Sequence, residues 1–147
     1  MKIQLKMDPQ VPADELHLHC REITDEVRMF ADKLQMHKIH GKNMEGDEVM
    51  VALSSVLYFE SVEKKVFAYT ENQVIKTDFR LYELEENCPE GWFFRISKTT
   101  LVNIGKIRLI RPEENRRLKI QLQNGEWVMI SRLYASAFKK QIKEGIR

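Results

Sequence analysis

The sequence predicts a mainly β fold with short helices over residues 48–147, and three observations support this prediction. Short stretches there alternate apolar and polar residues, as half-buried strands do. Turn-forming pairs such as Glu71–Asn72 and Asn124–Gly125 separate these stretches. Apolar residues at helical spacing are confined to short segments, whereas a wound α/β domain alternates its strands with long helices.

Residues 1–47 are predicted to form a small extension of two strands and one helix. The alternation in MKIQLKM (Met1–Met7) and ELHLHC (Glu15–Cys20) indicates the two strands. Apolar residues at helical spacing from Asp25 to His37 indicate the helix, and its acidic first turn suits the helix dipole. The polar, glycine-rich stretch Gly41–Asp47 then predicts a boundary with the β domain that follows.

The β domain is predicted to consist mostly of short strands. Strand patterns and short apolar runs cover Val49–Leu53, Val56–Phe59, Val66–Thr70, Gln73–Lys76, Trp92–Ile96, Leu101–Val102, Ile107–Ile110, Leu118–Leu122 and Glu126–Ile130. A charged turn is expected at Val62–Lys65. Helices are expected over Phe79–Glu86 and Leu133–Ile142, because one side of each would be apolar.

Composition indicates a soluble protein with a core of its own. Of the 147 residues, 43% are hydrophobic and 31% are charged. No window approaches the roughly 18 apolar residues that a membrane-spanning helix needs, and the N-terminus lacks the apolar run of an export signal. With only Cys20 and Cys88 and no CxxC spacing, we expect a cytoplasmic protein with reduced thiols.

Charge is distributed unevenly along the chain. Residues 48–94 hold four Lys/Arg and nine Asp/Glu, a net charge of −5, whereas residues 95–147 hold thirteen Lys/Arg and four Asp/Glu, a net charge of +9. The change falls within FFRISKTTLVN (Phe93–Asn103), where Lys98 stands among hydroxyl-bearing residues. Positive charge gathered on a surface attracts polyanions, and cations beside short hydroxyl donors suit phosphate oxygens and base edges.

Motifs for catalysis or cofactor binding are missing from the sequence. It contains no GxSxG, P-loop, HExxH or dinucleotide-binding glycine pattern, so we expect neither an enzyme nor a bound cofactor. The four histidines are His17, His19, His37 and His40, and an HxH pair on a strand could chelate zinc. Because no cysteine pair supports such a site, we expect no metal.

Five blocks of sequence carry a family resemblance. They are VLYFES (Val56–Ser61), LYELE (Leu81–Glu85), FFRISK (Phe93–Lys98), LVN (Leu101–Asn103) and ISR (Ile130–Arg132). In this order they resemble the LytTR DNA-binding domain of bacterial transcription regulators, from about residue 48 to 144. The resemblance implies an elongated β module whose loops enter the major groove of double-stranded DNA at repeated sites, often as a homodimer.

Many relatives of this kind carry a phosphoacceptor receiver domain ahead of the DNA-binding module. Residues 1–47 are too few for such a domain, so the resemblance implies a stand-alone regulator. Regulators of that kind are often encoded beside a small membrane protein that restrains them. That analogy makes such a membrane protein an expected partner.

The resemblance places specific DNA contacts in three loops. The first holds Lys64 and Lys65, either of which could contact DNA. The second holds Lys98, where the family often has an asparagine, and a lysine there favours phosphate or guanine acceptors over an adenine edge. The third holds Arg132, an arginine typical of the family. Each of these residues could instead be an ordinary solvated cation.

Several neighbouring residues have two interpretations each. Arg95 could contact phosphate or form an outward ion pair with Glu60 or Glu63. The densest basic run consists of Arg116, Arg117 and Lys119, and it is most simply a solvated face, with phosphate steering as the second interpretation. Asn103 matches a family asparagine, and we expect it to bond a turn backbone.

Two other classes of function compete with double-stranded DNA binding. A protein-interaction module could pair its acidic half with the basic half of another chain, without DNA. Sequence-specific RNA binding usually requires exposed stacking aromatics, whereas Trp92, Phe93, Phe94 and Trp127 are expected in the core.

Overall fold

The structure, a computed structural model, describes residues 2–13, 15–34 and 38–145. The chain divides into two compact units, Met1–Gln35 and Met36–Arg147, which are described separately below. The predicted boundary after residue 47 lies later in the chain than this division. It falls within a hairpin of the second unit, so residues 38–47 group with the β domain.

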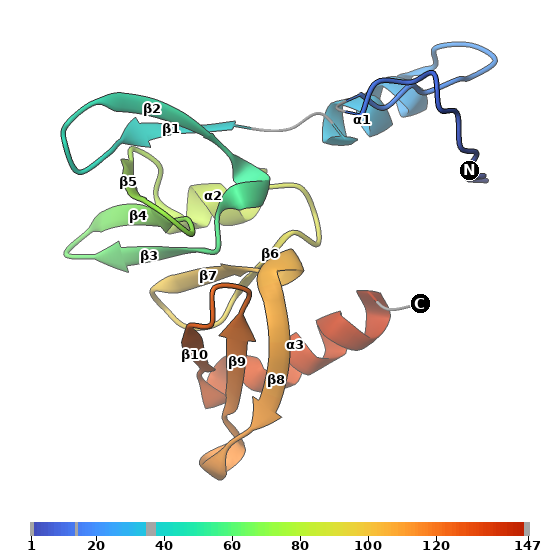
Figure 1. The fold of residues 1–147 in the computed structure, drawn as a ribbon. Coiled ribbons are helices and arrows are strands. Elements are labelled where there is room, and N and C mark those ends of the chain that lie inside the picture. The colour runs from blue at the N-terminus through green and yellow to red at the C-terminus, as the bar shows by residue number, and fades with distance from the viewer. Residues whose placement is uncertain (1, 14, 35–37, 146–147) are drawn as a thin grey trace. The chain divides into compact units, whose positions relative to one another are not determined.

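The first unit contains helix α1 (Asp25–Leu34; Figure 1). Its N-terminus forms as predicted, because the Thr24 hydroxyl accepts a hydrogen bond from the Val27 amide at 3.2 Å. The last residues of the predicted helix, 35–37, lie outside the described residues. The two predicted strands are wrong, since residues 2–7 and 15–20 form neither strand nor helix. Alternation shows only that one face of a segment could be buried. A strand also needs a neighbouring strand whose peptide groups can form hydrogen bonds with its own.

The described part of the second unit holds ten strands in two antiparallel sheets (Figure 1). The larger sheet has the order β2-β1-β5-β4-β3-β7-β6 and the smaller has the order β10-β9-β8. The strands are β1 (Lys38–Lys42), β2 (Glu48–Ala52), β3 (Tyr58–Val62), β4 (Lys65–Tyr69), β5 (Val74–Thr77), β6 (Phe93–Arg95), β7 (Thr100–Asn103), β8 (Ile107–Pro112), β9 (Leu118–Leu122) and β10 (Trp127–Ile130). The helices are α2 (Leu81–Asn87) and α3 (Arg132–Gly145), and three short 3-10 turns are η1 (Leu53–Ser55), η2 (Ile104–Lys106) and η3 (Glu114–Arg116).

The predicted mainly β fold is therefore confirmed. Most strands and α2 begin and end within two residues of their predicted bounds, whereas α3 continues three residues beyond its predicted end. Strand β1 was missed, because the sequence predicts no element for residues 38–40 and a polar break from Gly41 onward. Gly41 is not a break: it lies in β1, opposite Val49 on one side and Thr77 on the other. A Cβ at Gly41 would clash with the Lys76 carbonyl, so glycine permits this close approach of two strands.

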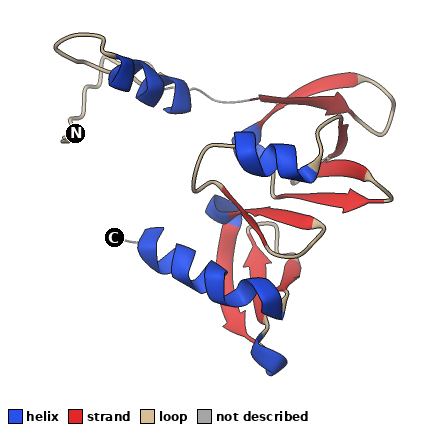
Figure 2. Ribbon diagram, turned by 180° about the vertical axis from the view of Figure 1, so that it is seen from behind, coloured by secondary structure: helices blue, strands red, loops and turns tan. Residues whose placement is uncertain are grey.

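Two hydrophobic cores form on opposite faces of the larger sheet. Adjacent strand residues point to opposite faces, so Leu101 joins the core under α2 whereas Val102 joins the core shared with the smaller sheet and α3. Figure 2 shows α2 and α3 each lying across a sheet. Strand β7, which pairs with β3 and β6, is buried along its whole length as a result. The turns at the ends of these strands are thereby held on a rigid support.

A hydrogen bond between side chains ties the two sheets together. The Tyr58 hydroxyl on β3 donates to Glu126 Oε2, beside β10, at 2.9 Å. Tyr58 also stacks on Tyr69, with ring centroids 4.6 Å apart. Burial and the neighbouring Glu126 carboxylate raise the pKa of Tyr58 above its ordinary value, so the hydroxyl remains protonated and keeps donating.

Asn103 bonds the backbone, as expected from the sequence. Its side chain is buried, its Nδ2 donates to the Val56 carbonyl at 2.8 Å, and its Oδ1 accepts from the Gly105 amide at 3.0 Å. These bonds join the end of β7 to the segment before β3.

Replacing Asn103 by alanine would leave the Val56 carbonyl and the Gly105 amide without these partners. We expect Asn103→Ala to lower the free energy of unfolding in urea by about 1–3 kcal/mol. The matched control is Asn72→Ala, because among the described residues the Asn72 side chain bonds only the Thr70 hydroxyl, in an exposed turn. Equal losses in the two variants would contradict the structural role of Asn103.

Candidate nucleic-acid interface

Three loops predicted to contact DNA lie next to one another. They are the β3–β4 turn (residues 63–64), the β6–β7 turn (residues 96–99) and the junction between β10 and α3 (residues 131–132). The Ser61 amide at the first donates to the Thr99 carbonyl at 2.8 Å, and the Ser131 amide at the third donates to the Ile96 carbonyl at 3.0 Å. Figures 1 and 2 show these loops along one side of the second unit. The β6–β7 turn therefore stands between the other two.

The β3–β4 turn is a two-residue hairpin whose residues both adopt positive φ. Glu63 has a φ of 51° and Lys64 a φ of 67°, in the left-handed region where a turn of this kind usually has Asn-Gly. Lys64 is exposed at the tip, whereas Lys65 begins β4 and pairs across the ladder with Val62. Of the two candidate lysines, Lys64 is thus the one carried by the turn.

Arg95 supports the β6–β7 turn from within. Its Nε donates to Glu85 Oε2 at 2.9 Å, and its Nη1 donates to the Lys98 carbonyl at 2.8 Å. The carboxylate partner is Glu85 on α2, and not Glu60 or Glu63 as the sequence suggested. The guanidinium is mostly covered, with 20% of the side chain exposed. Arg95 therefore fixes the backbone that presents the exposed side chain of Lys98.

Arg132 is the first residue of α3 and lines a basic depression of about 310 Å³. Arg116 and Arg117, from the β8–β9 turn, line the same depression together with Lys139. Glu113 contributes the one carboxylate of the lining. The structure thus brings together three predicted residues that are distant in sequence. Lys139 was missed, although its spacing from Arg132 places both on one side of a helix.

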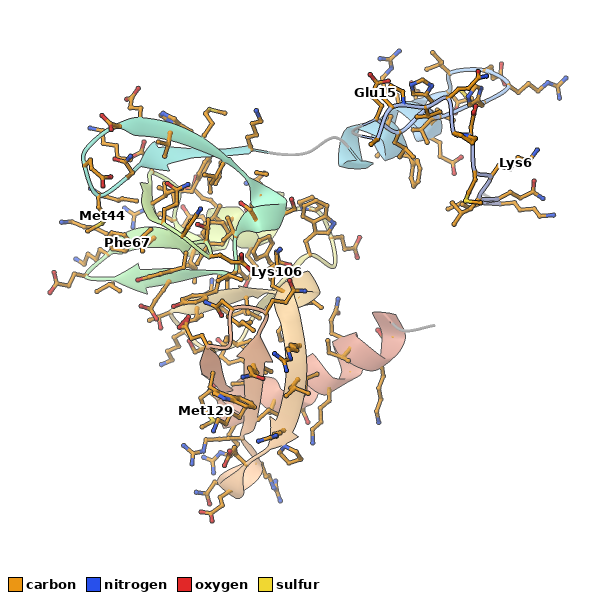
Figure 3. The ribbon with its side chains drawn as sticks, in the orientation of Figure 1. Lys6, Glu15, Met44, Phe67, Lys106 and Met129 are labelled. Atoms are coloured by element: carbon orange, nitrogen blue, oxygen red, sulfur yellow. The ribbon has the colours of Figure 1, made fainter. Side chains whose placement is uncertain are left out.

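Trp127 lies at the surface of the smaller sheet and not in the core, which corrects the prediction from the sequence. The Lys119 ammonium lies 4.6 Å and the Arg111 guanidinium 5.1 Å from the centre of its ring. Met129 lies on the same strand and is 41% exposed (Figure 3). Because two cations pack on the ring, Trp127 is not a free platform for stacking bases.

The described residues give little indication of metal binding, of a reactive thiol or of a membrane-spanning helix. Among them, no group of three or more His, Cys, Asp or Glu residues is placed to hold a metal ion. Burial raises the pKa of the Cys88 thiol to about 11, which disfavours the reactive thiolate at neutral pH. Nor does the described part of the chain include a helix that is long and apolar enough to cross a membrane.

Comparison with known proteins identifies the second unit. Residues 47–143 match the family model of the LytTr DNA-binding domain. Among solved structures, the fold is similar to the LytTr DNA-binding domain of a Bacillus cereus protein named as a putative methyl-accepting/DNA response regulator. The TM-score is 0.67 at 30% identity, over 71% of this chain and 95% of that one.

Similarity to curated proteins extends over nearly the whole chain. Two proteins of Staphylococcus aureus, from strains MSSA476 and MW2, are each 27% identical to it over 97% of this chain and 98% of their own length. Both are named as uncharacterized HTH-type transcriptional regulators. Since the family model covers most of the chain, this protein belongs to the LytTR family of DNA-binding domains.

Proposed function

We propose that this protein is a transcription regulator that recognises specific sequences of double-stranded DNA by inserting turns into the major groove. The observation that carries the proposal is the row of three joined turns, each of which presents an exposed cation: Lys64, Lys98 and Arg132. The names of the Staphylococcus aureus relatives support a regulatory role. The proposal includes action in the cytoplasm and no catalysis or cofactor.

Turns, and not a recognition helix, are proposed to read the bases. In the described structure α2 and α3 are separated by the five strands β6 to β10, so they do not form a helix-turn-helix pair. The β3–β4 hairpin ends in two residues, a tip narrow enough for the major groove, which admits a two-stranded ribbon. The β6–β7 turn and the β10–α3 junction, which lie next to it, would enter the same groove or reach its edge.

The cations divide into proposed base readers and phosphate contacts. Arg132 suits a guanine edge, because a guanidinium can donate two hydrogen bonds to the O6 and N7 acceptors. Lys98 and Lys64 suit guanine acceptors or phosphate, with Lys65 beside them. Arg116 and Arg117 suit the phosphate backbone next to Arg132, whereas Arg95 acts mainly by holding the Lys98 turn.

Homodimer formation through the first unit is part of the proposal. Leu5, Met7 and Leu16 are 95%, 99% and 71% exposed in that unit. A unit of 35 residues is too small to bury a core of its own without help, and a second copy would supply the missing apolar surface. Repeated DNA sites would then match the paired domains. Restraint by a small membrane protein stays a prediction from the family resemblance.

Arg132→Ala is expected to abolish most discrimination between the preferred site and an unrelated duplex. The lost bidentate contact corresponds to about 1–3 kcal/mol of discrimination. The site is first selected from a random DNA pool with the unaltered protein, and affinities are then measured by mobility shift. Arg117→Ala should instead weaken all sequences alike and reduce the salt slope by about one unit. Unchanged discrimination by Arg132→Ala would refute its role as a base reader.

Two substitutions at Lys64 separate turn strain from DNA binding. Glycine accepts a φ of 67° without the steric penalty of a side chain. We expect Lys64→Gly to raise the free energy of unfolding by about 1 kcal/mol, whereas Lys64→Ala should leave it nearly unchanged. Both should weaken binding of the selected site equally, because both remove the ammonium. DNA affinity that follows stability, and not charge, would contradict a contact by Lys64.

Removal of residues 1–35 tests the dimer. Size-exclusion chromatography with light scattering should give the full chain twice its mass of 17.4 kDa and the shortened protein the mass of a single chain. A full-length monomer at the concentrations used for DNA binding would refute dimerisation off DNA. Dimers of the shortened protein would place the interface in the second unit.

A further inference from the structure

A second basic depression lies at the opposite end of the row of turns from Arg132. It has a volume of about 270 Å³ and lies between the end of β3, the start of α2 and the end of β6. Lys64, Arg80 and Arg95 line it, and no carboxylate belongs to its lining. The first depression adjoins the last turn of the row, and this one adjoins the first turn. The sequence did not predict Arg80 as a site residue.

Two of the three cations are not neutralised by the protein. Arg95 is paired with Glu85, but among the described residues neither Lys64 nor Arg80 forms an ion pair. The nearby Glu83 carboxylate accepts a hydrogen bond from the backbone amide of Arg80 at 2.9 Å, at the start of α2. That carboxylate therefore caps the N-terminal end of α2, and the Arg80 guanidinium remains available to bind an anion.

Two hydroxyl-bearing residues and the apolar residues Val66 and Leu81 complete the lining. Ser61 and Tyr82 border the depression, and their hydroxyls make no hydrogen bond with another described residue. Cations together with hydroxyl donors are the side chains that hold DNA phosphates. A tetrahedral anion offers several oxygens that can accept from Arg80, Lys64 and these hydroxyls at once.

We propose that this depression binds a backbone phosphate of DNA, at the edge of the groove that the β3–β4 turn enters, with Arg80 as its main ligand. The inference rests on the proposed function. Phosphate contacts fix the register of a protein on the duplex. With Arg116 and Arg117 at one end and Arg80 at the other, the row of turns is held at both ends. With the register fixed in this way, each turn would contact the same base pair of the site in every bound complex.

The test is Arg80→Ala, with Lys76→Ala as the matched control. Both side chains are exposed, and among the described residues neither forms an ion pair, but Lys76 lies on β5 and outside the depression. Alanine at position 80 keeps the backbone amide that bonds Glu83, so the unfolding temperature should not change. Affinity for the selected site and for an unrelated duplex is measured at several salt concentrations. Arg80→Ala should weaken both by the same factor and reduce the salt slope by about 0.9, the value for one phosphate.

Three results would overturn the inference: an unchanged salt slope, a loss confined to the selected site, or an equal effect of Lys76→Ala. Inorganic phosphate is titrated in parallel, with the amide signals of Ser61 and Leu81 as reporters. Saturable phosphate binding that Arg80→Ala removes, without any change in the DNA salt slope, would assign the depression to a free anion instead. If Arg132→Ala loses discrimination while Arg80→Ala changes nothing, only this inference fails. If the unaltered protein does not discriminate between duplexes, the proposed function fails first.

Discussion

The peptide groups of the β6–β7 turn bond to the end of β3 on one side and to the β10–α3 junction on the other. The Thr99 carbonyl receives the Ser61 amide, and the Ile96 carbonyl receives the Ser131 amide. Both are backbone bonds, so the spacing of the three loops does not depend on the side chains that they present. Arg95 adds a side-chain brace to the same turn. Under the proposed function, a surface whose spacing is fixed in this way could change its DNA specificity by substitution at the exposed positions alone.

The acidic and basic halves of the sequence meet within the larger sheet. The order β4-β3-β7-β6 places the first strands of the basic half beside strands of the acidic half. Glu85 from the acidic half neutralises Arg95 from the basic half. Two depressions at the ends of the row of turns nevertheless collect several cations that form no ion pair with another described residue.

Sequence patterns predicted the β domain well wherever the alternation of apolar and polar side chains marks which face of a strand is buried. The β9–β10 hairpin follows from alternation and from Asn124–Gly125, and Gly125 does adopt a positive φ. Strand β1 escaped notice because its buried positions include Gly41, which has no side chain to mark an inward face. In the first unit the opposite error occurred: residues 2–7 and 15–20 alternate apolar and polar side chains, but in the described structure they pair with no other strand. Arg80 could not be found from sequence, because its position beside Lys64 results from the packing of α2 on the sheet.

Backbone strain in the described residues coincides with the proposed DNA-binding surface. Three positive-φ positions are occupied by Gly46, Gly91 and Gly125, which adopt this conformation without steric conflict. Two turns place other residues there: Glu63–Lys64 and Asn115–Arg116. A left-handed conformation costs about 1–2 kcal/mol at each such residue, less for asparagine. Each of these turns contributes a cation to one of the two basic depressions. Glycine would relieve the strain but remove the charge, so the cost of strain at these two turns is consistent with the anion binding proposed for them.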